Sequence, residues 1–567
     1  MTRKRPWAVT RPDAALTALA SVVLAVIMFR TAQTVWGTPP FTPDSWSYWE
    51  ISKHLFSGPF YMLDTFRSYQ QTVRVSTSFP PAWPALIWAG QVATGTGPHL
   101  MVGLAAGCYT LAGFVLAGVS FRRGFPAAAG PVALIVAFLV FPPLQEEIRA
   151  GRSVPLSVLL LTVLLLIWPG RQSRPHRFPF REALCGTVLG MMCLARYDAV
   201  PFVAALLLLS TLLFRSWRWR SAAAAVAGAA LVLAPWSAWS FQVLRTPWPS
   251  DNGVVASAVD PLFVTDIVPV PLRTASDDPS AWLARITVNT ADAVGSAAGS
   301  LGRSGHLLGL LAAVAVLALI AAHRDRLRGL TVSGALAGAV LRFVLNRPTV
   351  AVMVALVSQV LLSEAVTGYR DGRYWSLVVV LAAWWWSAVT LAAVVRVGPR
   401  LPRPFWPGLA AVGGLLLGQH LVRLPTVPTE PVSVGYDLTR IAACPHPGTL
   451  LYLSARTDAF RIGAQNRIPV AVPPRNLRAV TADALVVWAD KFDIRSVFVP
   501  TGTDLGYVTP IVTALVLSPG PCAVPGGAIL QRPNGPDQTD SQPVPVADRP
   551  PGTGPAGLLS SGGTPTS

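Results

Sequence analysis

Apolar runs separated by arginine clusters constrain the fold of this chain more than any other sequence feature. Several runs reach the roughly 20 residues with which a helix crosses a bilayer. With 52% hydrophobic and 13% charged residues and a mean hydropathy of +0.49, the 567-residue chain is too apolar for an ordinary soluble protein. The sequence therefore predicts a polytopic α-helical membrane protein with about 11 transmembrane helices. The expected spans are 14–35, 100–119, 127–141, 154–168, 183–195, 200–214, 222–241, 306–322, 349–366, 376–395 and 405–421.

The arginine clusters predict the orientation of these helices. Arg3, Lys4, Arg5 and Arg11 precede the first span, and each short loop assigned to the same side carries two or more arginines. Because cytoplasmic loops carry an excess of lysine and arginine, we expect a multi-pass protein of the plasma (inner) membrane with a cytoplasmic N-terminus. The net charge of +18 does not indicate nucleic-acid binding, because the arginines are spread over short clusters rather than gathered on one soluble face.

The segments between the spans differ in length and polarity. Within an expected transmembrane domain at 1–425, the outer loops 37–99 and 242–304 are long enough to be functional, the second as a lid or an acceptor-binding surface. Residues 330–345 are apolar but contain Arg342, so we expect a cytoplasmic interfacial helix, with a full span as the alternative.

Residues 430–533 have the composition of a small soluble domain. Expected strands alternate with one expected helix, and this alternation indicates an α/β domain on the extracytoplasmic side. The strands are expected at 449–453, 468–472 and 496–500, and the helix at 482–492.

Two cysteines and a polar tail accompany this domain. Cys444 and Cys522 flank it and can form a disulfide in an oxidising compartment, although their spacing alone does not establish one. The tail, 534–567, is rich in Pro, Gly, Ser and Thr, and we expect it to be disordered.

Charged residues gather at four points of the outer membrane boundary. Ionisable residues that face a bundle interior at that depth are usually functional. Arginine suits a phosphate through charge-assisted hydrogen bonds, and a carboxylate suits proton removal from a hydroxyl nucleophile. For any single site other than Asp44, an ordinary helix-end charge or a side chain that extends to water is the simpler explanation. The residues are Asp44, Glu146, Glu147, Arg196, Tyr197, Asp198, Arg370 and Arg373.

Four short stretches carry a resemblance to a known family. Together with the small C-terminal domain, their order resembles the integral-membrane glycosyltransferases of the C superfamily (GT-C), especially bacterial members near the protein-mannosyl and aminoarabinose transferases. The resemblance in architecture covers nearly the whole chain, while the motifs themselves are short. They are Asp44-Ser45-Trp46-Ser47-Tyr48, Ser78-Phe79-Pro80-Pro81-Ala82-Trp83-Pro84, Leu194-Ala195-Arg196-Tyr197-Asp198 and Gly372-Arg373-Tyr374.

The resemblance implies roles for the acidic residues. The family places an essential carboxylate in the first outer loop, where Asp44 stands. It often has a second acid between the third and fourth spans, where Glu146 and Glu147 stand. Many relatives have paired acids in the first loop, whereas here Ser45 follows Asp44. This departure favours a direct base role for Asp44. A divalent metal stays possible, although its ligands are unknown, and no cofactor is certain.

These observations together predict an inverting hexosyl or pentosyl transferase. Its donor would be a polyprenyl-phosphate-linked sugar whose tail lies among membrane lipid, and its acceptor an envelope glycan, lipid or protein. Asp44 would be the general base, assisted by Glu146 or Glu147. Donor phosphate would be bound by Arg196, Arg370 and Arg373, and the acceptor oriented by Tyr48, Lys53 and Asp198.

Two other classes of function are the alternatives. A lipid or solute transporter would be expected to show related halves and interrupted helices at mid-membrane, and the sequence shows neither. A non-catalytic envelope scaffold, in which the soluble domain is the working part, predicts that Asp44→Asn changes nothing.

Overall fold

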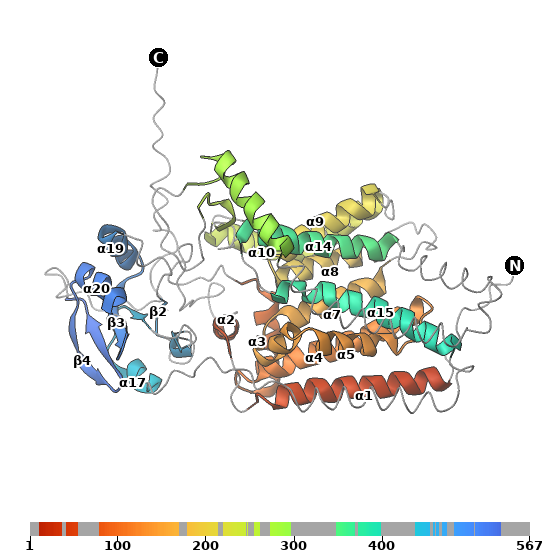
Figure 1. The fold of residues 1–567 in the computed structure, drawn as a ribbon, viewed down its shortest axis with the longest axis horizontal. Coiled ribbons are helices and arrows are strands. Elements are labelled where there is room, and N and C mark those ends of the chain that lie inside the picture. The colour runs from red at the N-terminus through yellow and green to blue at the C-terminus, as the bar shows by residue number, and fades with distance from the viewer. Residues whose placement is uncertain are drawn as a thin grey trace, which may run out of the picture.

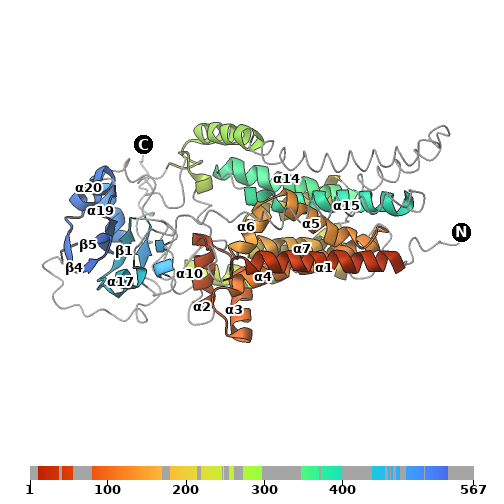
Figure 2. The ribbon, with the colours of Figure 1, turned by 60° about the horizontal axis from the view of Figure 1, so that its bottom comes forward.

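The computed structural model of this protein contains a helix bundle and a smaller α/β domain (Figure 1). The domain lies beyond the end of the bundle at which α2 (Pro43–His54) is found, in both views (Figures 1 and 2). The residues that the structure describes are 11–36, 41–54, 79–168, 179–213, 219–244, 247, 255–260, 273–295, 347–368, 372–397, 437–453, 458–459, 461–463, 468–472, 481–503 and 505–533.

Nine of the expected spans fall on helices of the bundle. The remaining two, 306–322 and 405–421, lie outside the described residues, as does the segment 330–345. The helices are α1 (Arg11–Gln33), α4 (Leu100–Arg122), α5 (Ala129–Val140), α7 (Val154–Ile167), α8 (Phe180–Ala195), α9 (Ala199–Leu208) with its π-helical continuation η1 (Leu209–Leu213), α10 (Trp219–Leu244), α14 (Arg347–Thr367) and α15 (Ser376–Val397).

Within the described ranges, five helices are long and apolar enough to cross a membrane. They overlap α1, α4, α10, α14 and α15, and a sixth span results if α5 and the short α6 (Pro143–Arg149) are counted together across their bend of 96°. The count of about 11 spans therefore stays a prediction.

The helices pack around α4, which contacts α1, α5 and α7, while α15 covers α5 and α14 lies along α9. The most extensive helix pair is α8 with α10. Its close approach depends on glycine: a Cβ at Gly186 of α8 would collide with the backbone oxygen of Ala225, and one at Gly228 of α10 with that of Ala183. Small residues at such contacts are what brings two membrane helices together, since lipid provides no hydrophobic drive between them.

One end of the bundle is marked by arginines of α4. Arg123 donates a hydrogen bond of 2.6 Å to the Thr349 hydroxyl at the start of α14, and Arg122 donates to the Leu166 carbonyl at the end of α7. Arg122 thus binds a carbonyl in the last turn of α7, where carbonyls lack intrahelical partners, and Arg123 joins the end of α4 to the start of α14.

The opposite end is built from short elements. They are α2, α3 (Ala82–Thr94), α6 and the 3₁₀ turn η2 (Gly372–Trp375); α2 lies on α3, and α6 contacts η2. The aromatic residues of α2 would also suit a helix that lies on the membrane surface with these side chains against lipid. Instead Trp46, Trp49 and Ile51 are buried within the protein, because α2 is a cap on the bundle end with its apolar side turned inward.

Part of the second outer loop is held against the bundle. Residues 279–295 are helical. From this helix, Arg285 donates to the Val366 carbonyl at 3.1 Å and Asn289 donates to the Ala365 carbonyl at 3.0 Å, in the last turn of α14. These carbonyls have no partner within α14, so the side chains cap it. Whether the loop acts as a lid stays a prediction.

The C-terminal domain is a five-stranded mixed sheet with the order β2-β1-β3-β5-β4. The β1–β2 and β1–β3 pairs are parallel, and β5 is antiparallel to both β3 and β4. The expected strands and helix correspond to β1, β2, β3 and α19, while β4, β5, α17 and α20 were not anticipated. The bounds are α17 (Leu438–Ala443), β1 (Thr449–Tyr452), β2 (Val470–Ala471), α19 (Ala482–Lys491), β3 (Ile494–Pro500), α20 (Leu505–Ala514), β4 (Ser518–Val524) and β5 (Gly527–Gln531).

Both faces of this sheet are buried. Leu451 and Val497 pack with residues of α19 and α20 on one face, while Leu450, Tyr452 and Phe498 point to the other, as the two-residue period of a strand requires. A disulfide joins Cys444, just after α17, to Cys522 in the edge strand β4. The expected disordered tail, 534–567, lies outside the described residues.

Candidate active site

Asp44 and Arg373 meet at the capped end of the bundle. Arg373 Nη1 donates a hydrogen bond of 2.7 Å to Asp44 Oδ2, across 329 residues of sequence. Asp44 lies in the first turn of α2 and Arg373 in η2. Their side chains keep 30% and 22% of their surface exposed, respectively, so a ligand can reach this ion pair.

A second arginine lies next to the first. Arg196 follows α8 and forms two parallel hydrogen bonds with Asp198, of 2.9 Å from Nε and 2.8 Å from Nη2. Burial lowers the pKa of Arg196, but the charge and hydrogen bonds of Asp198 outweigh burial and raise it above the usual value. Arg373 is near enough for its charge to oppose that rise. Arg196 therefore carries a permanent positive charge.

Both guanidinium groups lie near the ring of Tyr374. The Arg196 guanidinium carbon is 5.4 Å from the centre of the Tyr374 ring, and that of Arg373 is 5.7 Å from it. A tyrosine face attracts cations through its quadrupole, so one ring holds two like charges close together. A pair of arginines in this arrangement suits a ligand with several anionic oxygens.

The turn that carries Arg373 and Tyr374 is anchored from two directions. Trp375 Nε1 donates a hydrogen bond of 3.2 Å to Glu364, a buried acid near the end of α14. On the other side, an added Cβ at Gly372 would lie 3.2 Å from the Pro143 ring of α6. The position of Arg373 is thus set by α14 and α6.

The helix that carries Asp44 is held by the turn between α6 and α7. Ser45 donates to the Ala150 carbonyl at 2.6 Å, and the Tyr48 hydroxyl is 3.0 Å from that of Ser153. From α3, Trp83 Nε1 donates to the Gly151 carbonyl at 3.1 Å. Burial, followed by the charge of Asp44, raises the pKa of Tyr48 above its usual value. Tyr48 is therefore neutral and fixes α2 in place.

The two glutamates of α6 differ in their surroundings. Glu147 is fully buried, with an oxygen 3.0 Å from Arg152 Nε. The angle of that contact is not that of a hydrogen bond, so it is an ion pair within the α6–α7 turn. Glu146 is exposed. Of the two, Glu146 alone offers a carboxylate to a ligand.

The remaining predicted site residues lie around this centre or outside the described part. Lys53 pairs with the buried Glu50 at 3.3 Å and lies over the Trp49 ring. Arg370 is not among the described residues. Asp198 is engaged by Arg196 rather than directed at an open space.

Sequence reasoning missed Tyr374, Glu364 and Glu50. Tyr374 stood inside a quoted motif, and its signal was the Arg-Tyr pair in an outer turn. Glu50 had a local signal, a lysine three positions later in the same helix, which is its partner in the structure. Glu364 had none, because its donor Trp375 lies 11 positions away and beyond the end of α14.

The described residues contain no group of three or more His, Cys, Asp and Glu side chains placed to hold a metal ion. The two carboxylates nearest the centre, Asp44 and Asp198, each pair with an arginine. Two permanent positive charges beside them make this part of the site suited to an anion rather than to a divalent cation.

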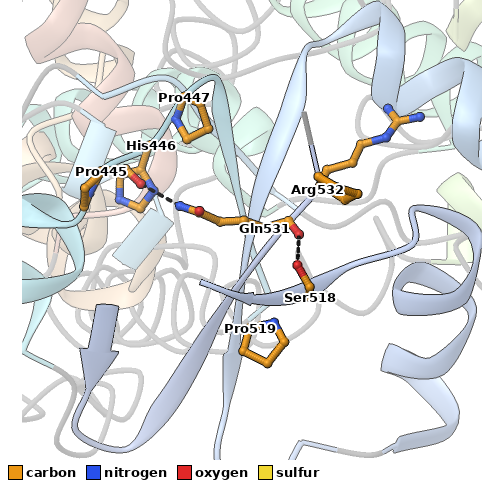
Figure 3. A pocket seen from close by; sticks show the side chains of 8 residues that line it. Pro445, His446, Pro447, Ser518, Pro519, Gln531 and Arg532 are labelled. Carbon is orange, nitrogen blue, oxygen red and sulfur yellow. Dashed lines mark hydrogen bonds between the residues drawn. The ribbon is translucent and has the colours of Figure 1, made fainter. Parts of the chain in front are cut away.

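A separate cavity of about 630 Å³ lies on the C-terminal domain. In Figure 3, Gln531 lies between the Pro445–Pro447 segment and Ser518 of β4. Its side chain donates to the Pro445 carbonyl at 2.9 Å, and its own carbonyl accepts from Ser518 at 3.3 Å. Half of the eight lining residues are prolines, and His446 and Arg532 are the ionisable groups.

Comparison with known proteins gives matches in structure but not in sequence. No family model matches the chain, and no curated protein matches it. The solved structures similar to it include ArnT from Cupriavidus metallidurans bound to undecaprenyl phosphate, with 16% identity, a TM-score of 0.41, and coverage of 93% of this chain and 98% of that one. They also include the archaeal oligosaccharyltransferase AglB from Archaeoglobus fulgidus, in complex with an inhibitory peptide and a dolichol-phosphate, with 13% identity, a TM-score of 0.48, and coverage of 88% and 71%.

These solved structures are GT-C membrane glycosyltransferases, the class that the sequence motifs resemble. Their identities are below 25% and their TM-scores below 0.5. The similarity therefore assigns neither a reaction nor a substrate to this chain.

Proposed function

We propose that this protein transfers a sugar from a polyprenyl-phosphate donor to a cell-envelope acceptor at the outer face of the plasma membrane. One observation carries the proposal: a carboxylate, Asp44, and two arginines around one tyrosine lie together at the capped end of an apolar helix bundle. A hydrocarbon tail suits the bundle, a phosphate suits the arginines, and a hydroxyl nucleophile needs a base.

The transfer is a single displacement at the anomeric carbon. The acceptor hydroxyl gives its proton to Asp44, and its oxygen forms a bond to the sugar. The bond between the anomeric carbon and the phosphate oxygen breaks, and the phosphate keeps the electron pair. Arg373 and Arg196 stabilise the charge that develops on this leaving group. One displacement inverts the configuration at the anomeric carbon.

The other predicted site residues take supporting roles in this scheme. Tyr48 acts through α2, because its hydroxyl is engaged with Ser153. Glu147 and Arg152 hold the α6–α7 turn on which α2 lies. The exposed Glu146, with Lys53 near Asp44 in sequence, remains a candidate for orienting the acceptor. The cavity of the C-terminal domain is a candidate for binding the rest of the acceptor.

The test compares wild type with Asp44→Asn in nanodiscs. Both are assayed with radiolabelled polyprenyl-phosphate sugars and envelope extract as the acceptor source. We expect transfer from one donor to fall about 100- to 10,000-fold in the variant, because a positioned general base contributes that much. Unchanged thermal unfolding would show that the variant is folded.

The matched control is Asp483→Asn, which neutralises an exposed acid in the first turn of α19 in the C-terminal domain. This substitution removes one negative charge, as Asp44→Asn does, but away from the site. The variant should therefore transfer sugar at the wild-type rate. Full activity in Asp44→Asn would contradict the base role. Absence of transfer from every donor, together with failure to bind any polyprenyl phosphate, would contradict the function itself.

A further inference from the structure

The two arginine–carboxylate pairs of the site are built differently. Arg196 and Asp198 are two residues apart, share two hydrogen bonds and keep 17% and 18% of their side-chain surface exposed. Asp44 and Arg373 come from elements far apart in sequence and are joined by a hydrogen bond of 2.7 Å from Arg373 Nη1 to Asp44 Oδ2. The second pair is also the more exposed. It is therefore the easier of the two to exchange.

The proposed transfer needs Asp44 and Arg373 for two different tasks: Asp44 takes the proton of the acceptor, and Arg373 binds the donor phosphate. A carboxylate held by a guanidinium is a weaker proton acceptor than one that is not, because the positive charge stabilises its ionised form. A guanidinium that donates to a carboxylate has fewer N–H groups to offer a phosphate. As long as the ion pair is intact, Asp44 is a weaker base and Arg373 has fewer N–H groups with which to bind the phosphate.

We propose that the Asp44–Arg373 ion pair is a substrate-operated gate: the donor phosphate replaces Asp44 on Arg373 and thereby releases Asp44 to act as the base. This inference rests on the proposed function and adds an order of events to it. The phosphodiester of the donor has two non-bridging anionic oxygens, as a carboxylate does, and can therefore take the place of Asp44 on a guanidinium through two hydrogen bonds. Arg196 stays paired with Asp198 and, with Tyr374, fixes the place at which the phosphate enters.

Two consequences follow from the gate. The acceptor hydroxyl finds an available base only after the donor has bound, so the donor binds first. Asp44 competes with the ligand for Arg373, so removal of its charge strengthens phosphate binding even though it abolishes transfer. A role for Asp44 in binding the phosphate directly, or no contact with it at all, predicts weaker or unchanged binding.

The experiment measures binding of farnesyl phosphate to the full-length protein in nanodiscs by native mass spectrometry. Farnesol, which has the same tail without the phosphate, gives the background. We expect Asp44→Asn to bind farnesyl phosphate about three- to tenfold more tightly than wild type, the range for loss of a partly exposed competing ion pair. In an Arg373→Gln background the same substitution should change nothing, because the shared partner is gone.

Asp483→Asn controls for the change in net charge and should leave binding at the wild-type level. If Asp44→Asn does not purify as a folded protein, Asp44→Ser makes the same comparison. Equal or weaker binding by the neutral variant, or a gain that persists in Arg373→Gln, would overturn the gate and leave the proposed function standing. Farnesyl phosphate that binds wild type no better than farnesol would overturn the proposed function as well.

Discussion

At the scale of single residues, the site depends on a tyrosine that touches no predicted reacting atom. The guanidinium carbons of Arg196 and Arg373 lie 5.4 and 5.7 Å from the centre of the Tyr374 ring. The charge of Arg373 opposes that of Arg196. The ring compensates in part, since the negative quadrupole of an aromatic face attracts a cation.

The role of the ring can be separated from that of the hydroxyl. We expect Tyr374→Phe to keep the donor KM within about threefold of wild type, while Tyr374→Leu raises it about tenfold, because cation–π contacts contribute on the order of 1 kcal/mol each. Steady-state assays of the two variants give the comparison. Equal donor KM values for Phe and Leu would show that the ring does not position the arginines.

A histidine on the C-terminal domain gives a pH prediction. Burial lowers the pKa of His446 below its ordinary value of 6.5, and its Nε2 lies 2.8 Å from the Ile441 carbonyl. The neutral ring is therefore favoured in the folded domain, and the unfolded chain takes up a proton first as the pH falls. Stability contributed by this group is present above about pH 6.5 and is lost below it.

Hydrogen exchange of the full-length protein tests that sign. Peptides from β4 and β5 should exchange faster at pH 5.5 than at pH 7.5, after correction for the intrinsic rates, and His446→Gln should remove most of the difference. A pH effect that survives the substitution would assign it to other groups.

At the scale of elements, the contact between α8 and α10 depends on glycines, because a residue without a Cβ lets the two backbones approach closely. A Cβ at Gly228 meets the backbone of Ala183, which cannot move out of the way as the end of a flexible side chain can. Gly107 of α4 is the natural comparison, because no atom lies within 4 Å of the Cβ position there. The same substitution should have opposite effects at the two positions.

We expect Gly228→Ala to destabilise the bundle by about 1–3 kcal/mol through overpacking. In contrast, Gly107→Ala should stabilise its helix by up to about 1 kcal/mol, because alanine loses less backbone freedom than glycine. Unfolding in mixed micelles with increasing denaturing detergent measures both. Destabilisation of similar size at the two positions would show that the close approach of α8 and α10 does not determine stability.

The elements also show what sequence reasoning could and could not supply. Long apolar runs such as Leu100–Arg122 were found because composition alone distinguishes them. The inward face of α2 was missed, because Trp46 and Trp49 suit a membrane surface as well as a protein interior. Strand β4 was missed since Pro519, Gly520 and Pro521 are poor strand formers that only an edge position tolerates.

The site divides in the same way. Asp44, Arg196 and Arg373 were identified from charge at the membrane boundary, and the structure places them around Tyr374. The pairing of Asp44 with Arg373 could not be predicted, because it joins residues 329 positions apart through the packing of α6 against η2. The burial of Glu147 beside Arg152 likewise depends on the α6–α7 turn and not on local sequence.

At the scale of the whole molecule, the disulfide reports the side of the membrane on which the C-terminal domain lies. Cys444 and Cys522 are bonded, whereas Cys108, Cys185 and Cys193 are buried and free. Disulfides persist in oxidising compartments and are rare in the cytoplasm. We therefore expect the disulfide to form in the cell only if the C-terminal domain is extracytoplasmic, so a test of the disulfide also tests the topology.

Cells that express the full chain can be lysed in denaturant with a thiol-reactive polyethylene glycol. We expect three modified cysteines without reductant and five with it, because only the Cys444–Cys522 pair is protected. Cys522→Ser should lower the unfolding free energy of the domain by about 2–4 kcal/mol, since the bond closes a long loop in the unfolded chain. The matched Cys108→Ser variant lies in α4 and leaves the pair intact. Five modified cysteines without reductant would place the domain in the cytoplasm, reverse the orientation of the bundle, and separate the arginine site from any acceptor outside the cell.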